Sequence, residues 1–470
     1  MSIRGHTEQL KILVFATQDN PLAARISIAL ACVGFHVAAL TRLGHPVRKT
    51  RKIPRHFDYH TRFRLKSIIR AIDRWSPDLV VCTDDLAVRE LQDLHKRMAT
   101  SDDGADRRFS DLIERSFGPP ASFPAMRNKS CFLALAKFEG LRCPKTIVIP
   151  ATRAFEPAAA ELTYPIVAKA DQSDGGRCVR IVNGDADLRP AIWELQAPST
   201  WRGRRIFGAV LGSEGLSPLK LPLRRTISLQ EYIAGRPGNR AVICWKGRVL
   251  AGISVEVVEE TQERGPASVI RLVDHPEMAA ACERMVERLH LSGFVGFDFM
   301  IDSANRAWLL EMNPRVTQIC HFSLADGTDL AGALYTQMKR QPPRPRPASI
   351  NRDLIALFPN EISRSPSSTY LQSCQHDVPW EEPELVRSVL NQIRRTHIRK
   401  QARRFAEYYL PAVVGSLVRV GLLGACAAND SPPRLEAKTS QIEGITPPLR
   451  PSPDSLVDRA TFGGDTFRNA

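Results

Sequence analysis

The chain has 470 residues, 43% of them hydrophobic and 24% charged, which is typical of globular proteins and allows two or three domains. Its net charge of +15 indicates an anionic partner, and charge alone does not choose between nucleic acid, an anionic membrane and phosphate-bearing substrates. Scattered cysteines without a C-x-x-C motif, and a first segment without an apolar secretion signal, predict free thiols and a cytoplasmic protein.

The first part of the chain alternates strand and helix patterns. Apolar strands are predicted at Lys11–Ala16, Phe35–Leu40 and Pro77–Cys82, with a helix at Pro21–Val33. This alternation predicts a Rossmann-like parallel sheet over residues 1–120. The turn after the first strand lacks G-x-G-x-x-G, which disfavours an NAD site, and His56–His60 is expected to be a surface loop. Thr100–Phe123, rich in Asp, Ser, Gly and Pro, is expected to be a loop that joins this domain to the next.

Residues 121–341 are predicted to form an α+β domain. A helix starts near Asn128, and a second is expected at Pro276–Leu289. Strands are expected at Thr146–Ile149, Ile166–Lys169, Cys178–Val182, Ser228–Ile233, Arg240–Trp245, Val249–Val258, Phe294–Ile301 and Ala307–Asn313.

Beyond residue 341 we expect a C-terminal extension, residues 342–428, with a long basic helix at Pro383–Tyr409, and a disordered tail at 429–470. The apolar segment Leu410–Ala428 contains Pro411 and Arg419, which disfavour a membrane-spanning helix. We expect it to dock on the protein itself, and contact with an anionic membrane surface is the alternative.

Two predicted strands near residue 300 form a hairpin with the turn residues Asp302–Asn305. If the turn is centred between Ala304 and Asn305, Asp298 lies directly opposite Glu311, and Asn313 shares their face. Opposed carboxylates destabilise a sheet unless a cation intervenes, so the pattern predicts a magnesium or manganese site. The alternatives are an exposed face on which two acids align, or a register shifted by one residue.

Glu311-Met-Asn-Pro-Arg315 after such a strand resembles the metal-binding signature of the ATP-grasp superfamily, in particular of its biotin-carboxylase-like members. The resemblance covers roughly residues 10–340 and implies a two-lobed ATP-grasp domain. It also implies that Asp298, Glu311 and Asn313 hold the Mg²⁺ (or Mn²⁺) ions that bridge the ATP phosphates. Arg315 would then reach the transferring phosphoryl group.

Lys169 precedes the run Gly175-Gly176-Arg177, and this segment resembles the flexible phosphate lid of the superfamily. Glycines there let backbone N–H groups approach a phosphate without a Cβ in the way. The resemblance implies nucleotide binding by all four residues and a catalytic role for Lys169. Taken alone, a lysine before a Gly-Gly turn is more often an ordinary loop.

Three further positions carry the resemblance to the nucleotide site. Lys129, at the start of a helix, matches a nucleotide-contacting lysine, and its alternative is a solvated cation. Ser228–Gly235 resembles the hinge strand that recognises adenine, which implies the carbonyl of Glu231 and the N–H of Ile233. A plain buried strand is the alternative there.

The resemblance implies an ADP-forming carboxylate–amine ligase: a carboxylate is activated by ATP as an acyl phosphate and captured by an amine or a thiol. The alternative is a nucleotide-binding sensor or scaffold without ligase activity. Biotin carboxylase itself is disfavoured, because Val316–His321 lacks the expected glutamate and no biotin-carrier segment follows. Nucleic acid is not expected as a partner, and a homodimer stays open.

Overall fold

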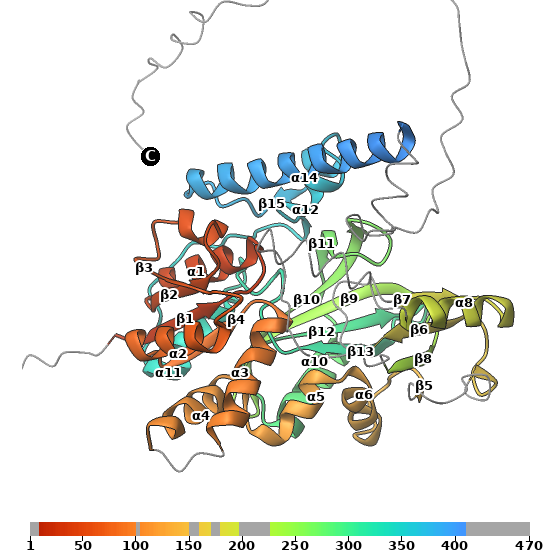
Figure 1. Ribbon diagram of the computed structural model, residues 1–470, viewed down its shortest axis with the longest axis horizontal. Helices are drawn as coiled ribbons and strands as arrows, with labels where there is room; N and C mark the ends of the chain where they lie inside the picture. The colour runs from red at the N-terminus through yellow and green to blue at the C-terminus, as the bar shows by residue number, and fades with distance from the viewer. Residues whose placement is uncertain (1–8, 100–103, 150–158, 171–178, 197–225, 410–470) are drawn as a thin grey trace, which may run out of the picture. The chain divides into compact units, whose positions relative to one another are not determined.

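The computed structural model describes residues 9–99, 104–149, 159–170, 179–196 and 226–409. These residues contain three sheets, with the strand orders β3-β2-β1-β4, β5-β8-β6-β7 and β13-β12-β9-β10-β11-β14-β15 (Figure 1). The first belongs to the N-terminal domain, and the other two are the sheets of two lobes.

The N-terminal sheet is parallel throughout, as predicted. Its strands are β1 (Lys11–Phe15), β2 (His36–Thr41), β3 (Arg55–Asp58) and β4 (Leu79–Cys82). β3 corrects the expectation of a surface loop at His56–His60: its backbone extends the sheet next to β2, and Phe57 is buried. The chain winds from β1 to β2 on one side and adds β4 on the other, so the carboxyl ends of β1 and β4 flank a switch point.

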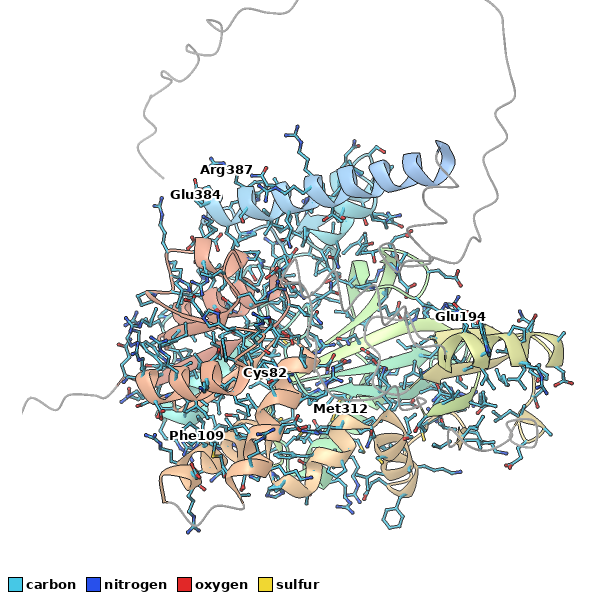
Figure 2. The ribbon with its side chains drawn as sticks, in the orientation of Figure 1. Cys82, Phe109, Glu194, Met312, Glu384 and Arg387 are labelled. Atoms are coloured by element: carbon cyan, nitrogen blue, oxygen red, sulfur yellow. The ribbon has the colours of Figure 1, made fainter. Side chains whose placement is uncertain are left out.

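Four helices accompany this sheet: α1 (Leu22–Val33), α2 (Arg64–Trp75), α3 (Asp85–Met98) and α4 (Gly104–Phe117). α4 shows that the predicted loop at Thr100–Phe123 is wrong over most of its length. Its apolar residues Phe109, Ile113 and Phe117 recur at helical spacing and are buried against α2 and α3. Phe109 is labelled in Figure 2, on the helix itself. The helical period therefore outweighs the polar composition.

The smaller lobe is an antiparallel sheet with one helix on it. The elements are β5 (Thr146–Ile149), β6 (Ile166–Ala170), β7 (Val179–Val182), α8 (Asp185–Gln196) and β8 (Ile227–Glu231). Leu188, Ile192 and Leu195 of α8 form one core with the buried strand residues. These strands confirm the sequence prediction to within two residues at each end.

The larger lobe has a sheet covered on both faces. Its strands are β9 (Arg236–Trp245), β10 (Arg248–Glu260), β11 (Ala267–Leu272), β12 (Gly293–Ile301), β13 (Ala307–Asn313), β14 (Leu354–Ala356) and β15 (Gln375–His376). One face packs on α6 (Lys129–Phe138) and α10 (Pro276–Leu289). The other packs on α1 and α11 (Leu330–Lys339), so this face and the N-terminal domain share a core.

The C-terminal extension is part of the larger sheet. β14 pairs with β11, and β15 pairs with β14. The predicted basic helix is confirmed as α14 (Pro383–Tyr409), whose Leu385 and Val389 are buried in the core shared with α1. On its exposed side Glu384 forms an ion pair with Arg387 (Figure 2). The remaining short elements are η1 (Pro46–Lys49), η2 (Pro120–Ser122), α5 (Phe123–Arg127), α12 (Asn360–Arg364) and α13 (Tyr370–Ser373).

Among the residues that the structure describes, no helix is both long and apolar enough to cross a membrane. The apolar segment Leu410–Ala428, which the sequence suggests for docking or membrane contact, lies outside them.

The β12–β13 hairpin contains a β-bulge. From the turn outward its pairs are Ile301–Ala307, Met300–Trp308, Phe299–Leu309, Asp298–Glu311, Phe297–Met312 and Gly296–Asn313. Leu310 is the extra residue. The predicted pairing of Asp298 with Glu311 is confirmed, but next to the turn the predicted register is off by one residue. The reason is that the turn is centred on Ala304, with Asn305 in the left-handed conformation at φ 59°.

Candidate active site

A cavity of about 910 Å³ is lined by residues of both lobes and of the N-terminal domain. It brings together eight of the residues singled out in the sequence: Lys129, Lys169, Glu231, Ile233, Asp298, Glu311, Asn313 and Arg315. The other three, Gly175, Gly176 and Arg177, lie outside the residues that the structure describes. Side chains separated by up to 186 positions in the sequence therefore share one cavity.

Asp298 and Glu311 lie opposite each other on the cavity side of the hairpin. Asn313 Nδ2 donates a hydrogen bond to Asp298 Oδ2 at 2.9 Å, and Asn239 of β9 donates to Oδ1 of the same carboxylate. Asn239 faces Asp298 because the two residues pair in the β9–β12 register. The sequence analysis missed Asn239, since it started this strand at Arg240 and had no means to place β9 beside β12.

The two carboxylates differ in their charge environment. Lys129 Nζ lies 2.6 Å from Glu311 Oε2. Burial alone would raise the pKa of Glu311, but Lys129 and Lys169 outweigh it and hold that pKa below its usual value. Asp298 has amide partners instead, and burial together with the neighbouring Glu311 raises its pKa. Asp298 is thus the acid whose negative charge the protein compensates least.

The residues at this point fit a divalent hard cation. Two carboxylates and an amide group come from adjoining strands, and oxygen donors of this kind suit Mg²⁺ or Mn²⁺. An added positive charge would replace the proton that the raised pKa of Asp298 favours. Within the described part of the chain, no group of three or more His, Cys, Asp and Glu side chains is arranged for a metal, so Asn313 is needed to complete this set.

Comparisons with known proteins agree with this architecture. No family model matches the chain. Among solved structures, N5-carboxyaminoimidazole synthase from Aspergillus clavatus, in complex with ADP and 5-aminoimidazole ribonucleotide, aligns over 72% of this chain and 78% of its own at 15% identity, with a TM-score of 0.51. Biotin carboxylase from Campylobacter jejuni aligns over 72% of both chains at 16% identity, with a TM-score of 0.50. The chain has the ATP-grasp fold.

A curated relative points to the same fold. The large chain of carbamoyl phosphate synthase from Xylella fastidiosa (strain 9a5c) is 27% identical over 227 residues, which cover 45% of this chain. That stretch is 19% of the relative, so the ATP-grasp chain described here spans a small part of its length.

The second lysine of the ATP-grasp cavity lies in the smaller lobe. Lys169 Nζ donates to Gln230 Oε1 at 2.6 Å, and Gln230 Nε2 donates to Thr146 Oγ1 at 2.9 Å. Burial lowers the pKa of Lys169 to about 8, although Glu311 opposes this shift. The lysine is therefore held in place but easily discharged. Gln230, which fixes it, carries no recognisable sequence signal.

The hinge between the lobes lines the cavity through its backbone. Glu231 ends β8, and its N–H donates to the carbonyl of Lys145 at 2.9 Å. Ile233 follows outside the strand, so the strand ends two residues earlier than the sequence predicts. Both residues line the ATP-grasp cavity, as the resemblance implies.

Arg315 connects the hairpin to the N-terminal domain. Its Nη2 donates to Asn313 Oδ1 at 3.1 Å, and its Nε lies 2.9 Å from Asp85 Oδ1 at the start of α3. Asp85 was not singled out in the sequence, because nothing local connects positions 85 and 315.

The C-terminal extension supplies part of the cavity wall through Leu357–Asn360 and Asp377. Asp377 Oδ2 lies 3.4 Å from Arg25 Nη2 and 3.1 Å from His321 Nε2, and Asp377 Oδ1 accepts a hydrogen bond from the Phe358 N–H. Arg25 and His321 also line the cavity. The ATP-grasp lobes, α1 and the extension thus meet at one buried carboxylate.

Proposed function

We propose that the protein is a magnesium-dependent, ADP-forming ligase that activates a carboxylate as an acyl phosphate and joins it to an amine or a thiol. The observation that carries the proposal is the pairing of Asp298 with Glu311 in a cavity that Lys129 and Lys169 also line. The similarity to a synthase solved with ADP and 5-aminoimidazole ribonucleotide supports this reaction class.

The two lobes divide the binding of ATP between them. The backbone of Glu231 and Ile233 would take the adenine edge, and the ammonium groups of Lys129 and Lys169 would neutralise phosphate oxygens. Lys129 is paired with Glu311 at 2.6 Å, so it lies between the predicted phosphate and metal positions.

Asp298, Glu311 and Asn313 would hold Mg²⁺, which when bound neutralises charge on the phosphate oxygens. The chain's own residues then orient the reactants. Arg315, held by Asn313, presents a guanidinium fork to the phosphoryl group, whose transfer depends mainly on positioning and charge stabilisation.

The reaction has two steps. An oxygen of the substrate carboxylate attacks the γ-phosphorus of ATP, the bond to the bridging oxygen breaks, and ADP leaves. The amine nitrogen then attacks the acyl carbon, inorganic phosphate leaves with the C–O bond electrons, and the nitrogen loses a proton. The wall formed by Leu357–Asn360, Arg25 and His321 lies in the same cavity and is where we expect the acceptor.

An ADP-release assay tests the proposal. Purified full-length protein is given Mg²⁺, ATP and a panel of carboxylic acids, with and without amines, and products are identified by mass. ADP release that needs both a carboxylate and an amine supports a ligase. Tight nucleotide binding without turnover would favour the sensor or scaffold instead. ATP affinity that is indifferent to Mg²⁺ would overturn the assignment.

A further inference from the structure

Asp85 belongs to the N-terminal domain, yet its carboxylate touches the cavity's arginine. Asp85 Oδ1 forms an ion pair with Arg315 Nε at 2.9 Å, with side-chain exposures of 29% for Asp85 and 22% for Arg315. Asp85 is the first residue of α3 and follows β4 by two positions. The contact therefore comes from the carboxyl edge of the parallel sheet, which is where α/β sheets present functional groups.

A backbone contact holds the two segments in register. The N–H of Val316 donates to the carbonyl of Cys82, the last residue of β4, at 3.0 Å. The segment after β13 is thus fastened to β4 at one point and to α3 at another. Cys82 and Met312 are labelled in Figure 2, on β4 and near β13.

Asp85 is not needed to cap its own helix. That role belongs to Asp84, whose Oδ1 accepts the Ala87 N–H at 2.9 Å and whose carboxylate also binds the N–H and hydroxyl of Thr17. The Asp85 side chain is therefore available for Arg315. It also faces Lys129, whose pKa it helps to raise.

Packing alone does not fix the guanidinium. A second cavity of about 80 Å³ is lined by Asp85, Arg315 and Asn313, so empty space adjoins the arginine. Like charges nearby, on Lys129 and on any bound cation, push the guanidinium away from the phosphate position. A fixed carboxylate on the side of the N-terminal domain counters this repulsion.

We propose that Asp85 is a positioning residue, which holds Arg315 in the orientation that meets the terminal phosphate of ATP. The proposal rests on the proposed function, because it needs Arg315 to contact that phosphate. It assigns the N-terminal domain a part in distinguishing ATP from ADP. Losing the orientation should weaken binding of the triphosphate about tenfold, as expected for one charge-assisted hydrogen bond, and spare the diphosphate.

The test compares Asp85→Asn, Asp85→Glu and the control Asp93→Asn. Asp93 is on the same helix and forms an exposed ion pair with Arg127 at 2.7 Å. Calorimetry gives the Kd of each full-length variant for Mg²⁺ with a non-hydrolysable ATP analogue and with ADP. We expect Asp85→Asn to weaken only the analogue, Asp85→Glu to recover part of the loss, and Asp93→Asn to match the wild type.

Equal losses for both nucleotides in Asp85→Asn, or no loss for either, would overturn the inference and leave the proposed function standing. A wild-type protein that binds neither nucleotide would overturn both. Melting temperatures of the three variants check folding, and a merely structural role of Asp85 would not change the ratio of the two Kd values.

Discussion

Asp298 of β12 and Glu311 of β13 face each other because Leu310 bulges out of the strand between Glu311 and the turn. Side chains alternate along a strand, and Ala307 and Leu309 are buried in the core. Continued alternation would bury Glu311 as well. The bulge reverses the phase, so Glu311 and Asn313 line the cavity and Met312 takes the core position.

Replacing Glu311 by Gln should remove most of the Mg²⁺ dependence of ATP binding. The substitution deletes one carboxylate and the partner of Lys129, so we expect the Kd for ATP with Mg²⁺ to rise at least about 100-fold. Calorimetry with and without Mg²⁺ measures the effect. Glu287→Gln, which changes an exposed residue of α10, serves as the control and should bind like the wild type. Unchanged Mg²⁺ dependence in Glu311→Gln would contradict the metal site.

Arg315→Met should lower the rate of ADP release about 10²–10³-fold, because one group that stabilises transition-state charge is lost. The affinity for ADP should change little. Initial rates at saturating ATP measure the effect once the assay panel has identified substrates. A variant with normal turnover would show that Arg315 does not reach the reacting phosphoryl group.

The affinity for ATP should fall as the pH rises above about 8. Burial lowers the pKa of Lys169 to about 8, so the ammonium is present below that pH and is lost above it. Only the charged form attracts phosphate oxygens. Binding titrations from pH 6.5 to 9.5 should show this loss in the wild type. In Lys169→Arg the curve should be flat, since the guanidinium stays charged; identical curves would contradict the assignment.

The free energy of unfolding should fall as the pH drops from about 6.5 to about 4. His45 is buried, its Nδ1 accepts the Val47 N–H at 3.0 Å, and its Nε2 lies 3.1 Å from the carbonyl oxygen of Gln18. This pair of contacts fits a neutral ring. Burial lowers the pKa of His45 to about 4, whereas the unfolded chain takes up its proton near pH 6.5.

The proton is bound first by the unfolded chain, so stability present above pH 6.5 is lost on acidification. The shift from 6.5 to about 4 corresponds to about 3 kcal/mol. Urea unfolding at several pH values measures it, and His45→Gln should flatten the dependence. The exposed His60, replaced by Gln, is the control and should leave the slope as it is.

Asp377→Asn should destabilise the fold by about 3–5 kcal/mol, because it leaves the Arg25 guanidinium buried without a counter-charge. Burial alone would raise the pKa of Asp377, but Arg25 and His321 outweigh it and lower that pKa, so the carboxylate is charged at neutral pH. Urea unfolding at pH 7 measures the loss. Combining Arg25→Met with Asp377→Leu should recover much of it.

Glu384→Gln, which breaks an exposed pair on α14, should change stability by less than about 1 kcal/mol. A similar loss from Asp377→Asn would show that the buried cluster contributes no more than a surface pair.

Local signals explain what the sequence predicts well. α10 and α14 have the predicted bounds, since each begins with a proline at its first position and continues with helical apolar spacing. The pairing of Asp298 with Glu311 follows from a short hairpin, although two offsets compensate: the turn is shorter on one side, and Leu310 restores the register.

Tertiary contacts explain what the sequence does not predict. Gln230, Asn239 and Asp85 acquire their roles only when β8, β9 and α3 come to lie beside residues far along the chain. β11 was missed for a related reason: its pairing with β10 is interrupted by register shifts, so no regular hairpin pattern marks it.

The pairing of β14 with β11 has a practical consequence for anyone who shortens this protein. A fragment that stops at residue 341 would retain every predicted nucleotide contact but uncover the backbone edge of β11 beside Val269, Ile270 and Arg271. Exposed edges of this kind recruit strands from other molecules. Such a fragment is therefore expected to self-associate and precipitate, and its inactivity would say nothing about catalysis.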